Sequence, residues 1–247
     1  MQASIVKEEV IYGDSPKMHG LIAYDPTKKE KVPGILVVHE GLGTGSYSRG
    51  RAVQLAEFGY VGFALDMYGE GKLHCSVDDA MVVQNEHFKC FDTAKKRFVA
   101  ALETLKQNEH CDPNNIAAIG YCYGGVIVLN ALRAGVELKG VASFHGGLDA
   151  LVKPEKGKVK GKALICHGEA DPIVPMEKVE AIKAEFEEAG IQYKYVGYPD
   201  IKHSFTNPEA DAIAEKNNMT AALGYSEKAD KESWLELQEF LKDIFTN

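Results

Sequence analysis

The chain has 247 residues, of which 45% are hydrophobic and 26% are charged, and its formal net charge is −8. No segment is biased or repetitive, so the composition is that of a folded globular protein and excludes a disordered or fibrous one. The acidic balance and the lack of a dense Lys/Arg stripe argue against a nucleic-acid partner, because phosphate neutralisation requires clustered cations. This length fits one domain, and we predict a single domain over residues 1–247.

The N-terminal sequence MQASIVKEEVIYG has neither the basic nor the apolar region of a secretory signal, and no apolar stretch approaches the roughly 18 residues that cross a bilayer. We therefore expect a cytoplasmic protein that has no membrane partner. An odd number of cysteines without a CxxC pair favours reduced thiols over disulfides or structural zinc. These cysteines are Cys75, Cys90, Cys111, Cys122 and Cys166.

The first predicted elements are two short β-prone segments, 4–13 and 18–26, joined by the turn-forming residues GDSP. They predict an N-terminal antiparallel hairpin. Downstream, apolar or β-rich runs end abruptly at polar or glycine residues, which is typical of strands buried on both faces. These runs are GILVVHEG (34–41), YVGFALDMYG (60–69), NIAAIGYC (115–122), GVASFHGG (140–147), KALICHGEAD (162–171) and YKYVGYPDIKHSF (193–205).

Helical patterns lie between these runs, with apolar residues at helical spacing in 94–105, 179–189 and 234–244. Strands that alternate with helices predict an α/β fold with a mostly parallel sheet, right-handed crossovers and helices on both faces. Residues 207–230 are the longest uncertain region, where we expect an excursion that contains one helix. The lysine-rich run 153–162 is expected to be a solvated loop and not a phosphate site.

Reactive side chains follow the predicted strands, at the edge where open α/β sheets bind their ligands. They are His39, Glu40, Asp66, Tyr68, Cys122, His145, Asp171 and His203. A metal site made from these histidines and Glu40 has no support from an HxH or HExxH spacing, and we expect none. We also expect no cofactor, because GYCYGG lacks the G-x-G-x-x-G spacing of a dinucleotide site.

The glycine-rich segment GYCYGG lies between a predicted strand and a predicted helix. Gly120, Cys122 and Gly124 match the G-x-S-x-G nucleophile elbow, in which a sharp turn lifts the nucleophile above the sheet, with Cys in place of Ser. The N–H groups and dipole of the following helix favour a thiolate at this position. The alternative is an inert core cysteine, which would gain nothing from flanking glycines.

An elbow nucleophile needs hydrogen-bond donors for the oxyanion that its attack creates. The backbone N–H of Tyr123 is the predicted first donor, because it directly follows the nucleophile. The second is expected from the loop HEGLG after the third strand, where Gly41 or Leu42 is placed to supply it.

The order nucleophile, acid, histidine is the order of a catalytic triad on this kind of fold, and Cys122, Asp171 and His203 follow it. Each of the latter two lies just beyond a predicted strand. A carboxylate at Asp171 would hold the His203 imidazole in the tautomer that accepts the thiol proton. The alternatives are a turn aspartate before Pro172 and a surface-loop histidine.

With these residues, the sequence resembles the dienelactone hydrolase family of the α/β-hydrolase superfamily over nearly the whole chain. The resemblance rests on HEGLG, DMYGEG, GYCYGG, FHGG, HGEADPIVP and HSF, in family order. It implies an α/β-hydrolase fold, with Cys122 as nucleophile, His203 as base and Asp171 as its orienting carboxylate. It also implies that Glu40 is a carboxylate beside the thiol that takes part in activating it.

One position departs from the family pattern, which has an arginine four residues after the catalytic histidine. This chain has Asn207 there, and its amide can donate a hydrogen bond but cannot neutralise a substrate carboxylate. We therefore predict a preference for neutral or weakly polar substrates. The residues expected to line the substrate pocket are Tyr68, His145, Phe205 and Asn207. The alternatives are core positions for the two aromatic residues and a hydrogen bond to backbone for His145.

The predicted function is hydrolysis of small-molecule esters or lactones through a thioester on Cys122. Two other classes stay open. An α/β-hydrolase scaffold could bind a small ligand without turnover, since a fold alone does not determine function. A thiol redox protein could use Cys122, although no resolving cysteine is near it in the sequence. The oligomeric state is open between monomer and dimer.

Overall fold

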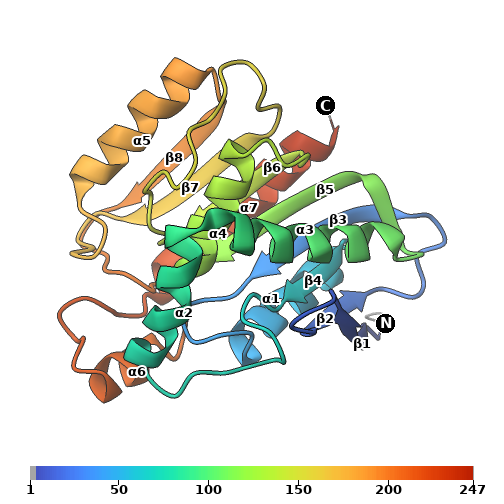
Figure 1. The fold of residues 1–247 in the computed structure, drawn as a ribbon, viewed down its shortest axis with the longest axis horizontal. Helices are drawn as coiled ribbons and strands as arrows, with labels where there is room; N and C mark the ends of the chain where they lie inside the picture. Colours follow the sequence, from blue (N-terminus) through green and yellow to red (C-terminus); the bar gives the residue numbers. More distant parts are fainter. Residues whose placement is uncertain (1–3, 247) are drawn as a thin grey trace. The chain divides into compact units, whose positions relative to one another are not determined.

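Residues 4–246 are described in the computed structural model, and this range contains eight strands and seven helices (Figure 1). The strands are β1 (Val6–Tyr12), β2 (Met18–Tyr24), β3 (Val32–Val38), β4 (Val61–Leu65), β5 (Cys111–Tyr121), β6 (Gly140–Phe144), β7 (Lys162–Gly168) and β8 (Tyr193–Tyr198). The helices are α1 (Ser46–Glu57), α2 (Val77–Lys89), α3 (Phe91–Gln107), α4 (Tyr123–Arg133), α5 (Met176–Ala189), α6 (Ala210–Lys216) and α7 (Glu227–Thr246).

The strands form one sheet in the order β1-β2-β4-β3-β5-β6-β7-β8. β1 pairs with β2 in an antiparallel hairpin, as predicted, and β2 pairs antiparallel with β4. The pairs β3–β4, β6–β7 and β7–β8 are parallel. Every residue of β4 and β6 is buried, which is what the continuous apolar runs predicted. The predicted α/β class and mostly parallel sheet are confirmed.

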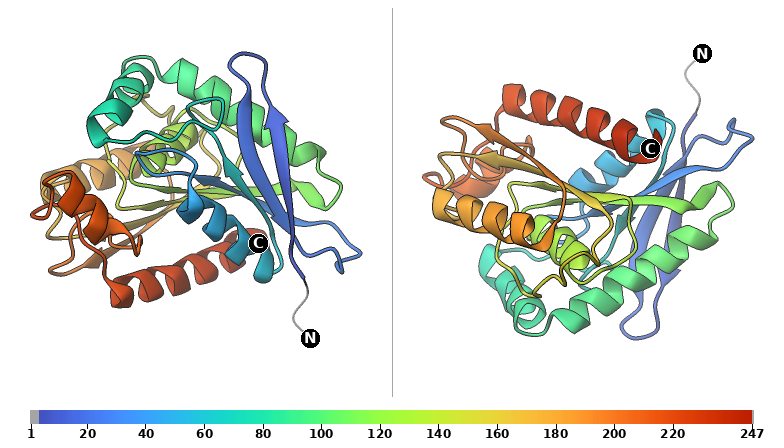
Figure 2. Two further views of the ribbon diagram at one scale, coloured as in Figure 1. Left: turned by 90° about the horizontal axis from the view of Figure 1, so that it is seen from below. Right: turned by 90° about the horizontal axis from the view of Figure 1, so that it is seen from above.

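The chain divides into two compact units, one that ends at Ile119 and one that begins at Gly120. In the first unit, α1 and α3 lie on opposite faces of the strands that they cover (Figure 2). In the second unit, α7 lies on one face of the strands, and α4 and α5 lie on the other (Figure 2). The boundary falls inside β5, so this strand contributes residues to both units. The single-domain organisation stays a prediction.

Asp66, at the end of β4, is a structural residue. Its side chain is fully buried, and Oδ1 accepts hydrogen bonds from the N–H groups of Tyr68 (2.8 Å) and Gly69 (2.9 Å). Oδ2 accepts a further bond from the Gly71 N–H at 2.8 Å. A buried carboxylate is tolerated when donors satisfy it in this way. Asp66 therefore shapes the DMYGEG loop, and both of its carboxylate oxygens are engaged in these hydrogen bonds.

His39 is fully buried at the end of β3 and joins two strand exits in the first unit. Its Nε2 accepts a hydrogen bond from the Met67 N–H at 3.2 Å, so the ring proton lies on Nδ1, which donates to the Glu40 carbonyl at 2.6 Å. Protonation of Nε2 would break the bond to Met67. Burial, opposed by the Glu40 hydrogen bond and by Asp66, lowers the pKa of His39 to about 4.

This neutral histidine predicts that acid destabilises the protein. The pKa of His39 is about 4 in the folded chain and 6.5 in the unfolded chain, so the unfolded chain takes up the proton first as the pH falls. Stability is therefore lost between these two values, and His39 contributes a loss of about 2 kcal/mol at pH 5. Urea unfolding at pH 7.5 and pH 5 should show a smaller loss in His39→Gln than in wild type.

His87 also has a pKa lowered to about 4, first by burial and then by the positive charge of Arg97. The charge of His39 is only the third cause of this shift, so most of the contribution of His87 is common to wild type and to His39→Gln. An equal loss of unfolding free energy in the two proteins would contradict the role given to His39.

Candidate active site

Cys122 lies in a strained turn between β5 and α4. Its φ is 52° and its ψ is −112°, in a region that a side chain with a Cβ rarely adopts and that costs about 1–3 kcal/mol. Its N–H donates to the Phe144 carbonyl at 3.0 Å, and its own carbonyl accepts from the Gly125 N–H at 3.0 Å. Tyr123 opens α4 directly after it. The geometry is that of the predicted nucleophile elbow.

Two glycines make this turn possible because backbone lies against them. A Cβ on Gly120 would stand 2.1 Å from the carbonyl oxygen of Gly124, and a Cβ on Gly125 would stand 2.6 Å from the Cα of Gly146. Backbone atoms cannot move aside as the end of a flexible side chain can. The glycines of GYCYGG therefore permit the close approach of strand and helix that the sequence predicted.

Asp171 and His203 form a buried hydrogen-bonded pair in the second unit, with 2.7 Å between Asp171 Oδ2 and His203 Nδ1. The other oxygen, Oδ1, accepts from the N–H groups of Ile173 (2.8 Å) and Val174 (3.2 Å), which orients the carboxylate. Since Nδ1 donates to Asp171, Nε2 is the ring nitrogen that can exchange a proton with another group.

The electrostatic environment of His203 links it to Cys122. Burial alone would lower the pKa of His203, but the charge of the Cys122 sulfur and the hydrogen bond of Asp171 outweigh it and raise the pKa to about 10. A hydrogen bond to Cys122 and the charge of Asp171 act in the same direction. The structure thus brings the three predicted triad residues together.

The segment that follows α6 braces the histidine. The His203 N–H donates to the Ala222 carbonyl at 3.0 Å, and the Gly224 N–H donates to the His203 carbonyl at 3.0 Å. These bonds make a short parallel bridge between His203 and Leu223. The excursion predicted over 207–230 contains one helix, as expected, and its second half supports the candidate base.

His145 and Phe205, expected to line the pocket, are both fully buried, and His145 packs against His203. The His145 ring meets the rings of His203 and Phe205 edge-on, each at a centroid distance of 5.2 Å. Its Nε2 lies 2.8 Å from Thr206 Oγ1. The sequence did not predict a role for Thr206, and only its position three residues after His203 could have indicated one. These positions favour support of the histidine over contact with a substrate.

Asn207 is also buried, and its side chain has a local role. Oδ1 accepts from the Glu209 N–H at 2.9 Å, and the Asn207 N–H donates to the Ser204 carbonyl at 3.1 Å. Such side-chain bonds to nearby backbone are typical of asparagine in turns. Asn207 therefore shapes the turn that leads into α6.

In the first unit, Glu40 and Gly41 follow β3, and the Gly41 carbonyl is held from two sides. It accepts from Tyr68 Oη at 2.7 Å and from Gln84 Nε2 at 3.2 Å. Tyr68, expected to line the pocket, thus uses its hydroxyl to fix the HEGLG loop. Gln84 lies on α2. The sequence did not predict its role, because a helical pattern gives no sign of a hydrogen bond to a residue as distant in the chain as Gly41.

His167, at the end of β7, is a further buried histidine that the sequence analysis did not single out. Burial lowers its pKa, Asp171 acts against this, and His203 adds to it. A neutral ring at this position does not compete with His203 for the charge of Asp171.

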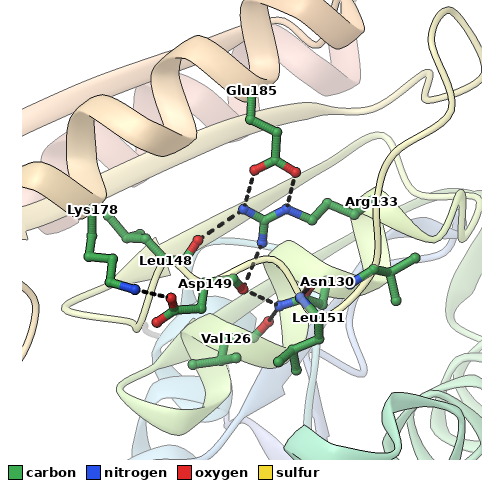
Figure 3. Close-up of polar contacts among 9 residues, drawn as sticks. Val126, Asn130, Arg133, Leu148, Asp149, Leu151, Lys178 and Glu185 are labelled. Carbon is green, nitrogen blue, oxygen red and sulfur yellow. Dashed lines mark hydrogen bonds and ion pairs between the residues drawn. The ribbon is translucent and has the colours of Figure 1, made fainter.

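The loop after His145 is fastened by the buried Arg133 of α4. Figure 3 shows its guanidinium paired with Glu185, at 3.0 Å for Nε–Oε1 and 2.8 Å for Nη2–Oε2, and bonded to the Leu148 carbonyl at 3.0 Å. Asn130 acts beside it: Oδ1 accepts from the Leu151 N–H at 2.7 Å. The loop that leaves the strained His145 is therefore held against α4.

Within residues 4–246, no group of three or more His, Cys, Asp or Glu is arranged to hold a metal ion. None of the helices in this range combines the length and the apolar character needed to cross a membrane.

Similarity to known proteins extends over nearly the whole chain. A model of the dienelactone hydrolase family matches residues 18–245. A solved structure named m3DLH is 30% identical with a TM-score of 0.92, over 98% of this chain and 99% of that one. A dienelactone hydrolase-like promiscuous phosphotriesterase from metagenomic libraries is 27% identical with a TM-score of 0.90, over 98% of this chain and 100% of that one. A putative carboxymethylenebutenolidase of Salmonella typhimurium is 23% identical over 218 residues, 85% of this chain and 76% of its own.

The buried Arg133 predicts a large stability effect. Its side chain is 0% exposed and that of Glu185 is 23% exposed, so Arg133→Met breaks a desolvated pair and should cost about 3–5 kcal/mol of unfolding free energy. The matched control is Lys178→Met, which removes the ion pair with Asp149, whose side chains are 47% and 60% exposed. This change should cost about 0–1 kcal/mol. Urea unfolding measures both, and equal losses would contradict the structural role of Arg133.

Proposed function

Since this chain belongs to the dienelactone hydrolase family and is a hydrolase of lactone or ester substrates, we propose that it acts through a Cys122 nucleophile and a thioester intermediate. The observation that carries the proposal is the buried Asp171–His203 pair, in which the pKa of His203 is raised by its interaction with the sulfur of Cys122. Nucleophile, base and orienting carboxylate are the three parts that acyl transfer requires.

In the proposed first half-reaction, His203 Nε2 holds the proton given up by the Cys122 thiol, and Asp171 stabilises this imidazolium. The Cys122 sulfur bonds to the substrate carbonyl carbon, and the electrons of the C=O double bond move to the oxygen. When the tetrahedral intermediate collapses, the bond to the leaving oxygen breaks and His203 returns the proton to that oxygen. In the second half, His203 takes a proton from water, the hydroxide attacks the thioester, and the acid and the thiol are released.

Two backbone N–H groups are proposed to bind the oxyanion. Tyr123 offers the first, because it begins α4 immediately after the nucleophile. The family resemblance implies Gly41 as the second donor, and within the first unit the carbonyl of the same residue, which belongs to the next peptide group, accepts hydrogen bonds from Tyr68 and Gln84. Loss of one such donor typically costs roughly 10²–10³ in turnover, so a rigid loop matters. Glu40, by family resemblance, takes part in activating the thiol.

The two other classes considered for this chain predict different kinetics. A binding scaffold would release at most one product per chain and then stop. A redox protein would consume peroxide, and Cys122→Ala would abolish this. Burial raises the pKa of both Cys111 and Cys166 to about 12, which keeps these thiols protonated at neutral pH and poorly suited to resolve an oxidised Cys122.

The triad proposal predicts an acyl adduct on the tryptic peptide that contains Cys122, detected by intact mass and peptide mapping of quenched turnover. His203→Ala should lower kcat/KM by at least roughly 10²-fold, and Asp171→Asn should also lower it, through the wrong imidazole tautomer. The exposed Cys90 provides the control, since Cys90→Ala should keep wild-type rates. An adduct on another residue, or near-wild-type rates in a folded His203→Ala, would overturn the proposal.

The substrate proposed is a neutral or weakly polar ester or lactone. Asn207 stands where the family has an arginine, and a hydrogen bond to a charged group contributes about 1.5–3 kcal/mol against roughly 1 kcal/mol for a neutral one. Carboxylate recognition should therefore be weaker by roughly 3- to 30-fold. Matched lactones that differ only in carboxylate against methyl ester should be compared by kcat/KM in wild type, Asn207→Arg and the uncharged control Asn207→Gln. A tenfold preference of wild type for the carboxylate would show that another cation replaces the arginine.

A further inference from the structure

We propose that His145 and Thr206 form a positioning pair that sets His203 relative to the turn of Cys122. The inference rests on the proposed function, in which Cys122 and His203 are nucleophile and base. Neither member of the pair is expected to touch the substrate, because both are almost completely buried. Their effect would be exerted through His203.

The end of β6 is joined by backbone to the nucleophile turn. The Phe144 carbonyl accepts the hydrogen bond of the Cys122 N–H at 3.0 Å. The next N–H, that of His145, donates to the Cys166 carbonyl of β7 at 2.9 Å. The Phe144 carbonyl and the His145 N–H belong to the same peptide group, so the peptide that holds Cys122 also ties His145 to the neighbouring strand.

The side chain of His145 reaches to the other half of the candidate site. Nε2 lies 2.8 Å from Thr206 Oγ1, and its ring meets the His203 ring at 5.2 Å between centroids, with 63° between the ring planes. Thr206 belongs to the turn that carries His203, which passes through the left-handed Ser204 (φ 59°). The contact thus connects the turn of the base to the strand end that holds the nucleophile.

The backbone of His145 indicates that this arrangement is imposed by its surroundings. Its φ of 40° is unusual for a residue with a Cβ, and such conformations persist only where neighbouring structure over-determines them. The next residue, Gly146, lies against Gly125, where an added Cβ would stand 2.7 Å from the Gly125 Cα. Arg133 then holds Leu148. The strand end is rigid on both sides of His145, which makes it a suitable anchor.

The test uses the rate of iodoacetamide alkylation of Cys122, expressed as the ratio of the rate at pH 6.5 to that at pH 9, together with kcat/KM. The groups that act electrostatically on His203 or lie against it are Cys122, Asp171, His167 and His145. His203→Ala serves as the reference, because the proposed function requires it to lower the alkylation ratio.

Thr206→Val removes the hydroxyl but keeps the shape, and it should lower the alkylation ratio in the same direction and kcat/KM by about tenfold or more, since small displacements of a reacting group cost up to about 10²-fold. Thr206→Ser restores the hydroxyl and should recover both. His145→Asn should act like Thr206→Val, because asparagine tolerates the left-handed backbone but cannot reach Thr206. Ser233→Ala, which removes a buried hydroxyl from α7, is the control and should change neither measurement.

The outcomes separate the two proposals. If His203→Ala leaves the alkylation ratio unchanged, the pairing of Cys122 with His203 is wrong and the proposed function fails. If His203→Ala lowers the ratio while folded Thr206→Val and His145→Asn match wild type in both measurements, only the positioning role is overturned. If Thr206→Val fails to fold, His145→Asn alone tests the positioning role. If Thr206→Ser does not recover the alkylation ratio, the role of the hydroxyl is contradicted.

Discussion

The left-handed backbone at Cys122 is the constraint on which the rest of the candidate site depends. The turn is stable only because Gly120 and Gly125 let backbone come within contact distance and because the Phe144 carbonyl accepts the Cys122 N–H. The same turn ends β5 and starts α4 within one residue, so the sulfur lies at the N-terminus of a helix, where the dipole favours negative charge. Cys122 therefore combines the strained backbone of the turn with the position of the proposed nucleophile.

Buried polar side chains, and not loop length, fix the segments that leave the strands. Asp66 accepts three backbone N–H groups after β4, Asp171 accepts two after β7, and Arg133 donates to a carbonyl after β6. Each group would be costly to bury alone, and each is compensated by the backbone that it organises. The result is a set of exit loops with little freedom, which a site built on loops requires.

The elbow and the order of the triad could be predicted because they depend on local spacing and on the sequence of strand exits. The roles of Tyr68 and His145 could not, since each depends on a hydrogen bond to a residue tens of positions away, Gly41 and Thr206. From sequence alone, an aromatic or imidazole ring at a strand exit is equally consistent with lining a pocket and with holding another residue of the site in place. The left-handed conformation of His145 is likewise invisible in sequence, because no glycine marks it.

The bridge between His203 and Leu223 has a consequence for the chain around α6. Both sides of the candidate base are hydrogen-bonded to a surface segment that lies about twenty residues further along the chain. The backbone position of His203 therefore depends on the length and continuity of that segment, while its imidazole is held separately by Asp171. Insertions or deletions there would reach the candidate base through its backbone, in a stretch that contributes no proposed reacting group.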